Sequence, residues 1–168
     1  QDLAVTLVGR PVFTDKNLAA TASHYTAARG VAEGWRLHGE KLPTLMQGNF
    51  AFAVIESHEN KTTLVLDRVG IERLSYAFQA GQFVFGTSVQ SVAAHPAIGR
   101  TIDLQAIYDY LYFHTIPAPR SLYKHIHKLL PGQIITFKNG QVAKDFYWHA
   151  DYAPAEADYE AHQIYFRK

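Results

Sequence analysis

A block of short, alternating apolar segments in the middle of the chain constrains the fold more than any other feature. Apolar residues recur at every second position in 50–54 and again in 62–66, on either side of SHENK, which has the composition of a hairpin loop. The run LSYAFQAGQFVFGT repeats this arrangement, with Gln79, Ala80 and Gly81 as its turn. The sequence therefore predicts four consecutive antiparallel strands, each buried on one face.

Helical patterns precede this block. A β-branched run at 3–8 reads as a strand closed by Gly9. Apolar spacing of three and four then predicts a helix from Lys16 that Gly30 closes, a second helical stretch over 31–37, and a short helix before Gly48.

Shorter elements follow the block. Ser88 occupies the N-cap position of a short helix, and Asp103 that of a longer one, which ends before the prolines of 116–119. We expect the aromatic cluster of this second helix to pack on a sheet; its members are Tyr108, Tyr110, Tyr112 and Phe113. The strings GQIITF and QVAKDFYW predict a final hairpin around Asn139-Gly140.

This order of elements predicts one α+β domain with layered antiparallel sheets. The 168 residues are 48% hydrophobic, which is enough to bury a core. A net charge of +1 leaves no excess to neutralise a phosphate backbone, so nucleic acid is not an expected partner. We also expect no membrane span, and a cytoplasmic protein.

Motifs for catalysis or metal binding are scarce. The chain has no cysteine, which removes thiolate metal ligands and any cysteine nucleophile within these residues. His125 and His127 share one face if they lie on a strand, but no HExxH or carboxylate-flanked pair accompanies them, so no metal site is predicted. GxSxG, GxGxxG and GxxxxGK[ST] are absent. From these patterns alone, the function stays open.

Five short strings in fixed order carry more information. They are GNFAFAVIE, LVLDRVGIERLSYAF, FGTSVQSVAAHP, IDLQAIYDYL and KLLPGQIITF. This series resembles the signature of the class II glutamine amidotransferase domain of asparagine synthetases, whose members carry G-x-FAFA, RDRxGxxPLYY, FASExKAL, ID-xx-A and LxPG. The resemblance runs from about Leu7 to Tyr152. It implies the N-terminal-nucleophile fold, an αββα sandwich of two antiparallel sheets between helical layers.

The same resemblance assigns residue roles. Gly70 fits a turn that needs the conformational freedom of glycine. We expect Asp67 and Arg68 to form a hydrogen-bonded pair that holds this turn, a structural and not a catalytic role.

The resemblance also implies a glutamine pocket, and here the chain departs from the family. Active members cleave glutamine with an N-terminal cysteine, whereas this chain begins at Gln1. The NGEIYN-like string falls at VGRPVF, and the acid that anchors the glutamine ammonium falls at an alanine with no Asp or Glu between Lys16 and Arg29. The degenerate pocket positions are Val8, Gly9, Arg10, Phe13 and Ala27. Pro11 removes a backbone donor, Ser88 replaces the FASE glutamate, and Leu66 replaces the first arginine of RDRxG.

These departures predict a glutaminase-fold domain over 1–152 that has lost glutamine hydrolysis, as in β-lactam synthetases and lasso peptide cyclases. Residues 153–168 are expected to begin the linker to a synthetase domain of the same polypeptide, which is the predicted partner. ATP and Mg²⁺ are expected in that domain, because no SGGxDS-type loop occurs here, and no cofactor is expected in this chain. Homodimerisation is left open.

Two alternatives remain at this stage. One is a true asparagine synthetase whose catalytic cysteine lies upstream of Gln1. The other is a free-standing binding module with an aromatic surface.

Overall fold

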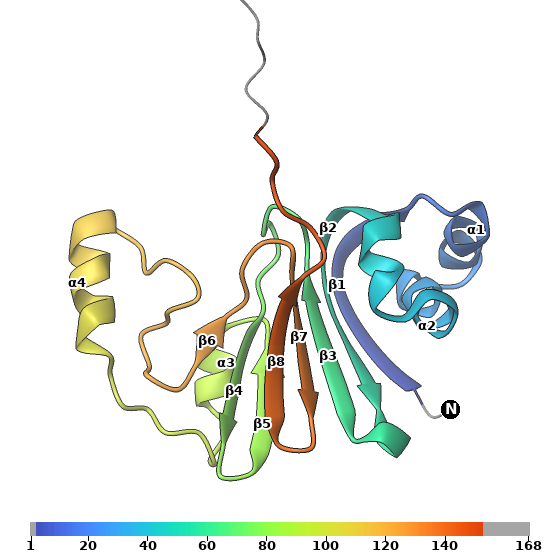
Figure 1. Cartoon of the computed structure of the whole chain (residues 1–168). Helices are drawn as coiled ribbons and strands as arrows, with labels where there is room; N and C mark the ends of the chain where they lie inside the picture. The colour runs from blue at the N-terminus through green and yellow to red at the C-terminus, as the bar shows by residue number, and fades with distance from the viewer. Residues whose placement is uncertain (1–2, 153–168) are drawn as a thin grey trace, which may run out of the picture.

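Two antiparallel sheets form the centre of this computed structural model, which describes residues 3–152 (Figure 1). The strands are β1 (Leu3–Phe13), β2 (Met46–Glu56), β3 (Lys61–Leu66), β4 (Ser75–Gln79), β5 (Gln82–Gly86), β6 (His127–Lys128), β7 (Gln133–Lys138) and β8 (Gln141–Phe146). The helices are α1 (Lys16–His24), α2 (Ala27–His38), α3 (Val89–Ala93) and α4 (Leu104–Phe113), with 3-10 helices η1 (Gly39–Leu45) and η2 (Ser57–Glu59). The segment 153–168, predicted as a linker, lies outside the described residues.

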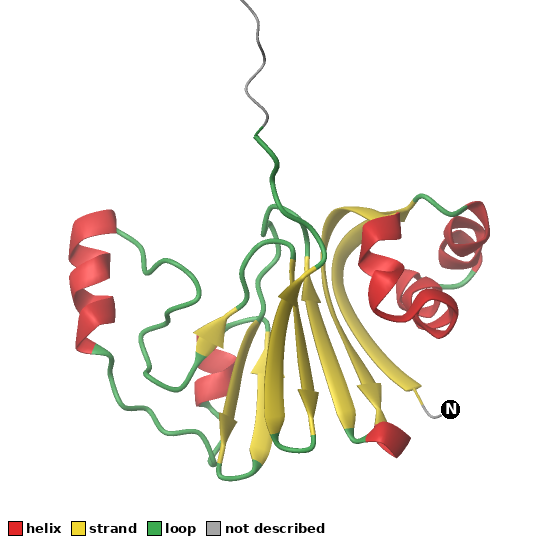
Figure 2. Cartoon of the chain, in the orientation of Figure 1, coloured by secondary structure: helices red, strands yellow, loops and turns green. Residues whose placement is uncertain are grey.

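The larger sheet has the strand order β1-β2-β3-β7-β8, and the smaller sheet has the order β5-β4-β6. Figure 2 shows the helices on the outer sides of the strands. The helices α1 and α2 cover the β1 side of the larger sheet, and α3 packs on β4 and β5. Within residues 3–152, no helix combines the length and the apolar character needed to span a membrane.

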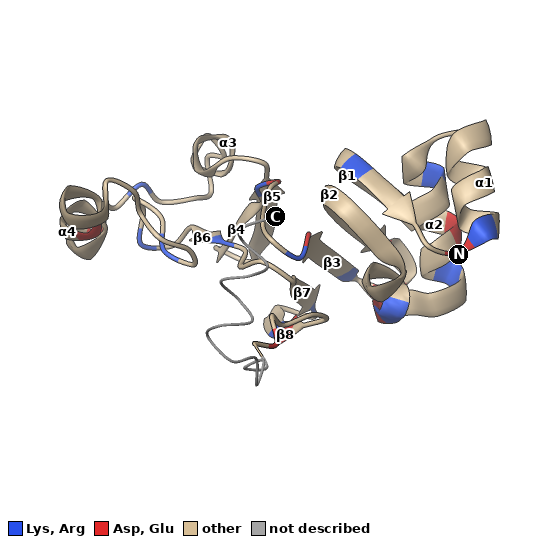
Figure 3. Ribbon diagram, turned by 90° about the horizontal axis from the view of Figure 1, so that it is seen from above, with Lys and Arg blue, Asp and Glu red and all other residues tan. Residues whose placement is uncertain are grey.

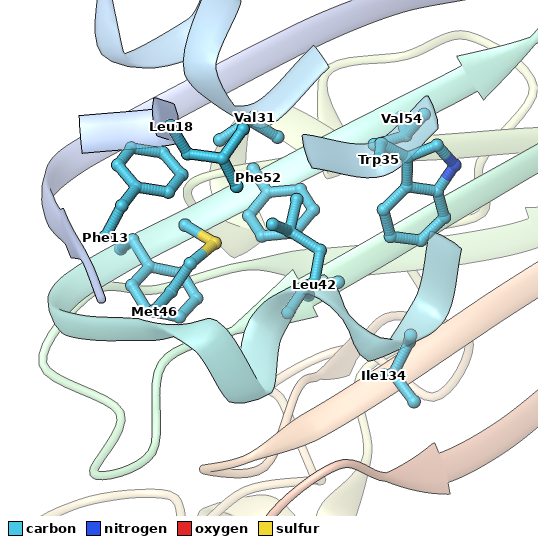
Figure 4. Close-up of a cluster of buried hydrophobic side chains, with 11 residues drawn as sticks. Phe13, Leu18, Val31, Trp35, Leu42, Met46, Phe52, Val54 and Ile134 are labelled. Atoms are coloured by element: carbon cyan, nitrogen blue, oxygen red, sulfur yellow. The ribbon is translucent and has the colours of Figure 1, made fainter. Parts of the chain in front are cut away.

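The larger sheet is covered on both faces, so the prediction of strands buried on one face is wrong for its centre. Phe50, Phe52 and Val54 belong to a buried cluster beneath α1, α2 and η1. Figure 4 shows Phe52 and Val54 within it. The intervening Ala51 and Ala53 are equally buried, because they face the smaller sheet. Small residues on this second face let the two sheets approach each other.

The two-residue hairpins follow the sequence prediction. Asn139 and Gly140 both have positive φ, as do Ala80 and Gly81, which is the backbone of a type I′ turn. This turn twists in the same sense as the strands it joins, so it fixes the β7–β8 and β4–β5 pairings.

The first helical segment divides at a different place from the predicted one. The break lies at Tyr25 and Thr26, where the Thr26 side chain caps α2 by accepting from the Arg29 N–H at 3.2 Å. Gly30 lies inside α2, and a Cβ there would come within 3.1 Å of the Phe13 ring. Gly30 therefore allows α2 to pack closely against β1, and it does not end the helix.

The first strand also runs further than predicted. It stays paired with β2 through Gly9 and Pro11 as far as Phe13, which lies opposite Met46. Proline is tolerated here because β1 is an edge strand, where a missing N–H breaks no pairing with a further strand.

Candidate functional site

The chain passes from the larger sheet to the smaller one through a turn over 67–74, and Asp67 holds that turn. This side chain is fully buried, and its carboxylate accepts hydrogen bonds from the backbone N–H groups of Val69 and Ile71 at 3.1 Å and of Glu72 at 2.9 Å. Gly70 has φ +69° and lies against Pro131, where a Cβ would come within 3.0 Å of the ring. The turn is therefore fixed by main-chain donors and by one glycine.

The predicted pair between Asp67 and Arg68 is wrong, because the two side chains have different partners. Three main-chain N–H groups surround the Asp67 carboxylate, whereas Arg68 donates from Nη2 to the Thr44 carbonyl at 3.1 Å. Tyr147 donates to the neighbouring Leu66 carbonyl at 2.9 Å. Burial, followed by the nearby Asp67 charge, raises the pKa of Tyr147. Asp67 therefore holds the turn through backbone N–H groups and not through Arg68.

The turn places the Glu72 side chain against β1 and β2. Asn49 donates from Nδ2 to the Glu72 carboxylate at 2.6 Å. Gly9, with φ +92°, lies beneath this pair: a Cβ there would be 2.3 Å from the Asn49 carbonyl oxygen and 2.9 Å from Glu72 Oε1. Only glycine fits at this position, because a Cβ would meet the Asn49 carbonyl and the Glu72 carboxylate.

A cavity of about 400 Å³ opens beside this pair, with Val8, Ile71, Glu72, Arg73 and Thr87 in its wall. It presents a carboxylate, a guanidinium and a hydroxyl next to two aliphatic side chains. None of these wall residues carries a thiol.

The predicted pocket positions are only partly brought together. Val8 lines the cavity and Gly9 adjoins Glu72, whereas Arg10 is exposed next to Gly9 on the same strand. Phe13 lies on the opposite face of the larger sheet, 6% exposed in the core beneath the helices. Ala27 is the first residue of α2 and is absent from the cavity wall.

Sequence reasoning missed the charged residues of this site. Glu72 and Arg73 come two and three residues after Gly70, and Arg73 stands where the family string RDRxGxxPLYY has proline. The available signal was the arginine in place of proline, next to the opposite charge of Glu72. Asn49 gave no such signal in the sequence, because it occupies the variable position of G-x-FAFA.

A second cavity, of about 390 Å³, lies beneath α4; Asp103, Asp109, Arg120, Lys124 and His127 contribute polar groups to its wall. His127 packs on the Tyr76 ring, with ring centroids 5.6 Å apart. Burial, and then the nearby positive charge of Lys144, lowers the pKa of His127. Among residues 3–152, no three potential metal ligands gather into a group.

Known proteins resemble this chain in sequence. The family described as "Glutamine amidotransferase domain" matches residues 20–148. Two asparagine synthetases of Bacillus subtilis named as glutamine-hydrolysing are 25% identical over 63% of this chain and 26% identical over 74%. A putative one from Methanocaldococcus jannaschii is 27% identical over 64%. The match spans only 17% and 20% of the length of the two B. subtilis relatives, in the order given, and 22% of the M. jannaschii relative.

Solved structures show the same fold at low identity. The glutamine phosphoribosylpyrophosphate amidotransferase from B. subtilis, in complex with ADP and GMP, superimposes with a TM-score of 0.55 at 12% identity, over 88% of this chain and 30% of its own. A structure described as the allosteric regulatory enzyme of purine biosynthesis gives 0.54 at 11% identity, over 89% and 30%. The predicted N-terminal-nucleophile sandwich is thereby confirmed.

The family match covers most of the chain, and the relatives in sequence are asparagine synthetases. The chain therefore belongs to the glutamine amidotransferase family, as a class II domain of the asparagine synthetase-like kind.

Proposed function

We propose that this domain has an inactive glutaminase site and serves as a structural domain of an asparagine synthetase-like, amide-forming ligase. The observation that carries the proposal is the Glu72 carboxylate, which lies against Gly9 and is held there by Asn49. In this proposal, the same stretch of β1 corresponds to the substrate-holding backbone and the oxyanion donor of active family members.

A carboxylate in that position disfavours the hydrolysis of glutamine. Hydrolysis of an amide develops negative charge on the carbonyl oxygen, and donors aimed at this oxygen supply much of the catalysis. Here Val8 replaces the donor asparagine, and Glu72 adds a negative charge beside it. The 168 residues also supply no cysteine to attack the amide.

The ligase activity belongs, in this proposal, to a synthetase domain of the same polypeptide. We assign ATP and Mg²⁺ to that domain, because this chain contains no SGGxDS-type loop. The curated relatives support the assignment by length, since the chain matches about a fifth of each.

A second candidate is an active glutaminase whose cysteine is encoded upstream. The observation in its favour is that all three curated relatives are named as glutamine-hydrolysing. The two candidates differ in one measurable property, the release of ammonia from glutamine.

The test uses the natural polypeptide that contains this chain. Isothermal titration with L-glutamine should give no saturable heat, and ammonia release in a coupled assay should stay at the level of a protein-free blank. A glutamine-hydrolysing asparagine synthetase serves as the positive control for both measurements. Stoichiometric binding, or ammonia release that alkylation of a thiol abolishes, would establish the second candidate instead.

A further inference from the structure

The helix α4 carries its apolar stripe on the side away from the domain. Its side chains at spacings of three and four are exposed: Leu104 76%, Ile107 40%, Tyr108 62%, Leu111 71% and Tyr112 69%. Residues at these spacings share one face of a helix. The expectation that the aromatic cluster packs on a sheet is therefore wrong, since Tyr110 and Phe113 are also 55% exposed.

Few side chains of α4 are buried against the rest of the domain. Ala106 is the buried residue of the helix, and Asp109 faces Arg120, whose Nε lies 3.1 Å from the Asp109 carboxylate. Arg120 also donates to the Asp103 carboxylate at 2.9 Å, which lowers the pKa of Asp103. The cavity of about 390 Å³ lies beside these ion pairs. Hydrogen-bonded ion pairs therefore hold the helix, and apolar packing contributes little.

This arrangement reverses the usual amphipathic pattern, in which the apolar face covers the core. Figure 1 shows α4 at the end of a long loop, apart from both sheets. In Figure 3 its ribbon is almost entirely tan, because Asp109 is the one charged residue of Leu104–Phe113. A contiguous, uncharged patch of this kind marks an interaction surface.

We propose that α4 is the docking surface for the synthetase domain of the same polypeptide, an inference that rests on the function proposed above. The matched relatives are about five times as long as the stretch they share with this chain, so a large neighbouring domain is available to cover the helix. A partner with an apolar, uncharged groove fits the stripe.

The size of the surface favours a tethered partner over a second copy. A helix of ten residues is about 15 Å long, and its one face is far smaller than the roughly 800 Å² per partner of a stable complex between separate molecules. A domain on the same chain is already present at high effective concentration, so a small apolar surface suffices to hold it.

The experiment places a photo-cross-linking residue, benzoylphenylalanine, at Tyr108 in the natural polypeptide. Its matched control carries the same residue at Leu37, which is 72% exposed on the helix α2. Irradiation should join position 108 to peptides downstream of residue 168 within a monomer, and position 37 should give at most a tenth of that yield. Adding Leu111→Glu to the Tyr108 variant should lower its cross-link yield at least tenfold, because a charge then faces the apolar groove.

Three outcomes would overturn the proposal: no cross-link from position 108 above that from position 37, cross-links between two copies of α4, or a natural polypeptide that encodes no synthetase domain. Leu37→Glu added to the Tyr108 variant controls for general effects of a new charge and should leave the yield unchanged. None of these readouts involves glutamine. An active glutaminase whose position 108 still cross-links to the downstream domain would contradict the proposed function and leave this inference standing.

Discussion

Asn49 donates a 2.6 Å hydrogen bond to Glu72 across 23 residues of sequence, and this bond ties the first part of β2 to the turn between the two sheets. It also places the Glu72 carboxylate beside Gly9. The same pair thus bears on the stability of the domain and on the chemistry of its candidate site.

The first prediction concerns the energy of this bond. A double-mutant cycle with Asn49→Ala and Glu72→Ala, followed by urea unfolding, should give a coupling free energy of about 1.5–3 kcal/mol, because one partner is charged and both are partly buried. The comparison cycle uses Lys138 and Glu59, an exposed pair at 2.9 Å, whose coupling should be much weaker in water. Equal couplings in the two cycles would contradict the prediction.

The second prediction concerns the buried carboxylate of the turn. Asp67→Asn should lower the free energy of unfolding by about 2–4 kcal/mol, because its NH₂ group then faces a backbone N–H that has lost its acceptor. Asp145→Asn provides the control, since the exposed Asp145 accepts a hydrogen bond from the adjacent Phe146 N–H and, within residues 3–152, from no other group. Urea unfolding of both variants measures the difference, and a similar small loss in each would refute the structural role.

The third prediction compares two glycines of similar backbone conformation. Gly81 has φ +75° with open space around it, so Gly81→Ala should cost only the left-handed conformation, about 1 kcal/mol. Gly132 has φ +68°, but a Cβ there would lie 2.5 Å from the Trp148 carbonyl oxygen. Gly132→Ala should therefore cost clearly more, because backbone has to move. Thermal unfolding of the two variants measures the two losses of stability. Equal losses would show that the positive φ, and not the space around the Cβ, determines the cost of the substitution.

The fourth prediction concerns pH. Burial lowers the pKa of His127 below its ordinary value of about 6.5. Protonation of His127 therefore favours the unfolded chain. The stabilisation that neutral His127 gives the folded chain is fully present above pH 6.5 and is lost as the pH falls from there through the folded-state pKa. Unfolding followed from pH 8 to pH 5 should show the free energy of unfolding declining less in His127→Gln than in the unsubstituted chain.

A His127→Gln profile parallel to that of the unsubstituted chain would contradict the prediction, because it would show that His127 binds its proton equally in the folded and unfolded states.

The sequence predicted those elements that local residues determine. Asn139-Gly140 specifies its hairpin through positive φ values, and Ser88 and Asp103 cap their helices with their own side chains. Gly30 misled the prediction because its role is tertiary: it admits the Phe13 ring, while the helix break comes from Thr26.

The candidate site depended more on the fold than on motifs. Glu72 meets Gly9 only because the turn after β3 crosses from one sheet to the other, and no local pattern reports that crossing. The outward stripe of α4 was equally hidden, since periodicity identifies an apolar face but not the direction in which it points.

The anchoring of the turn by Asp67 has an evolutionary consequence. Aspartate and glycine in that string serve the joining of two sheets, a requirement that persists in any descendant that must fold, whether or not it still cleaves an amide. A recognisable family signature therefore shows that the fold is inherited, and it does not show that the reaction is retained.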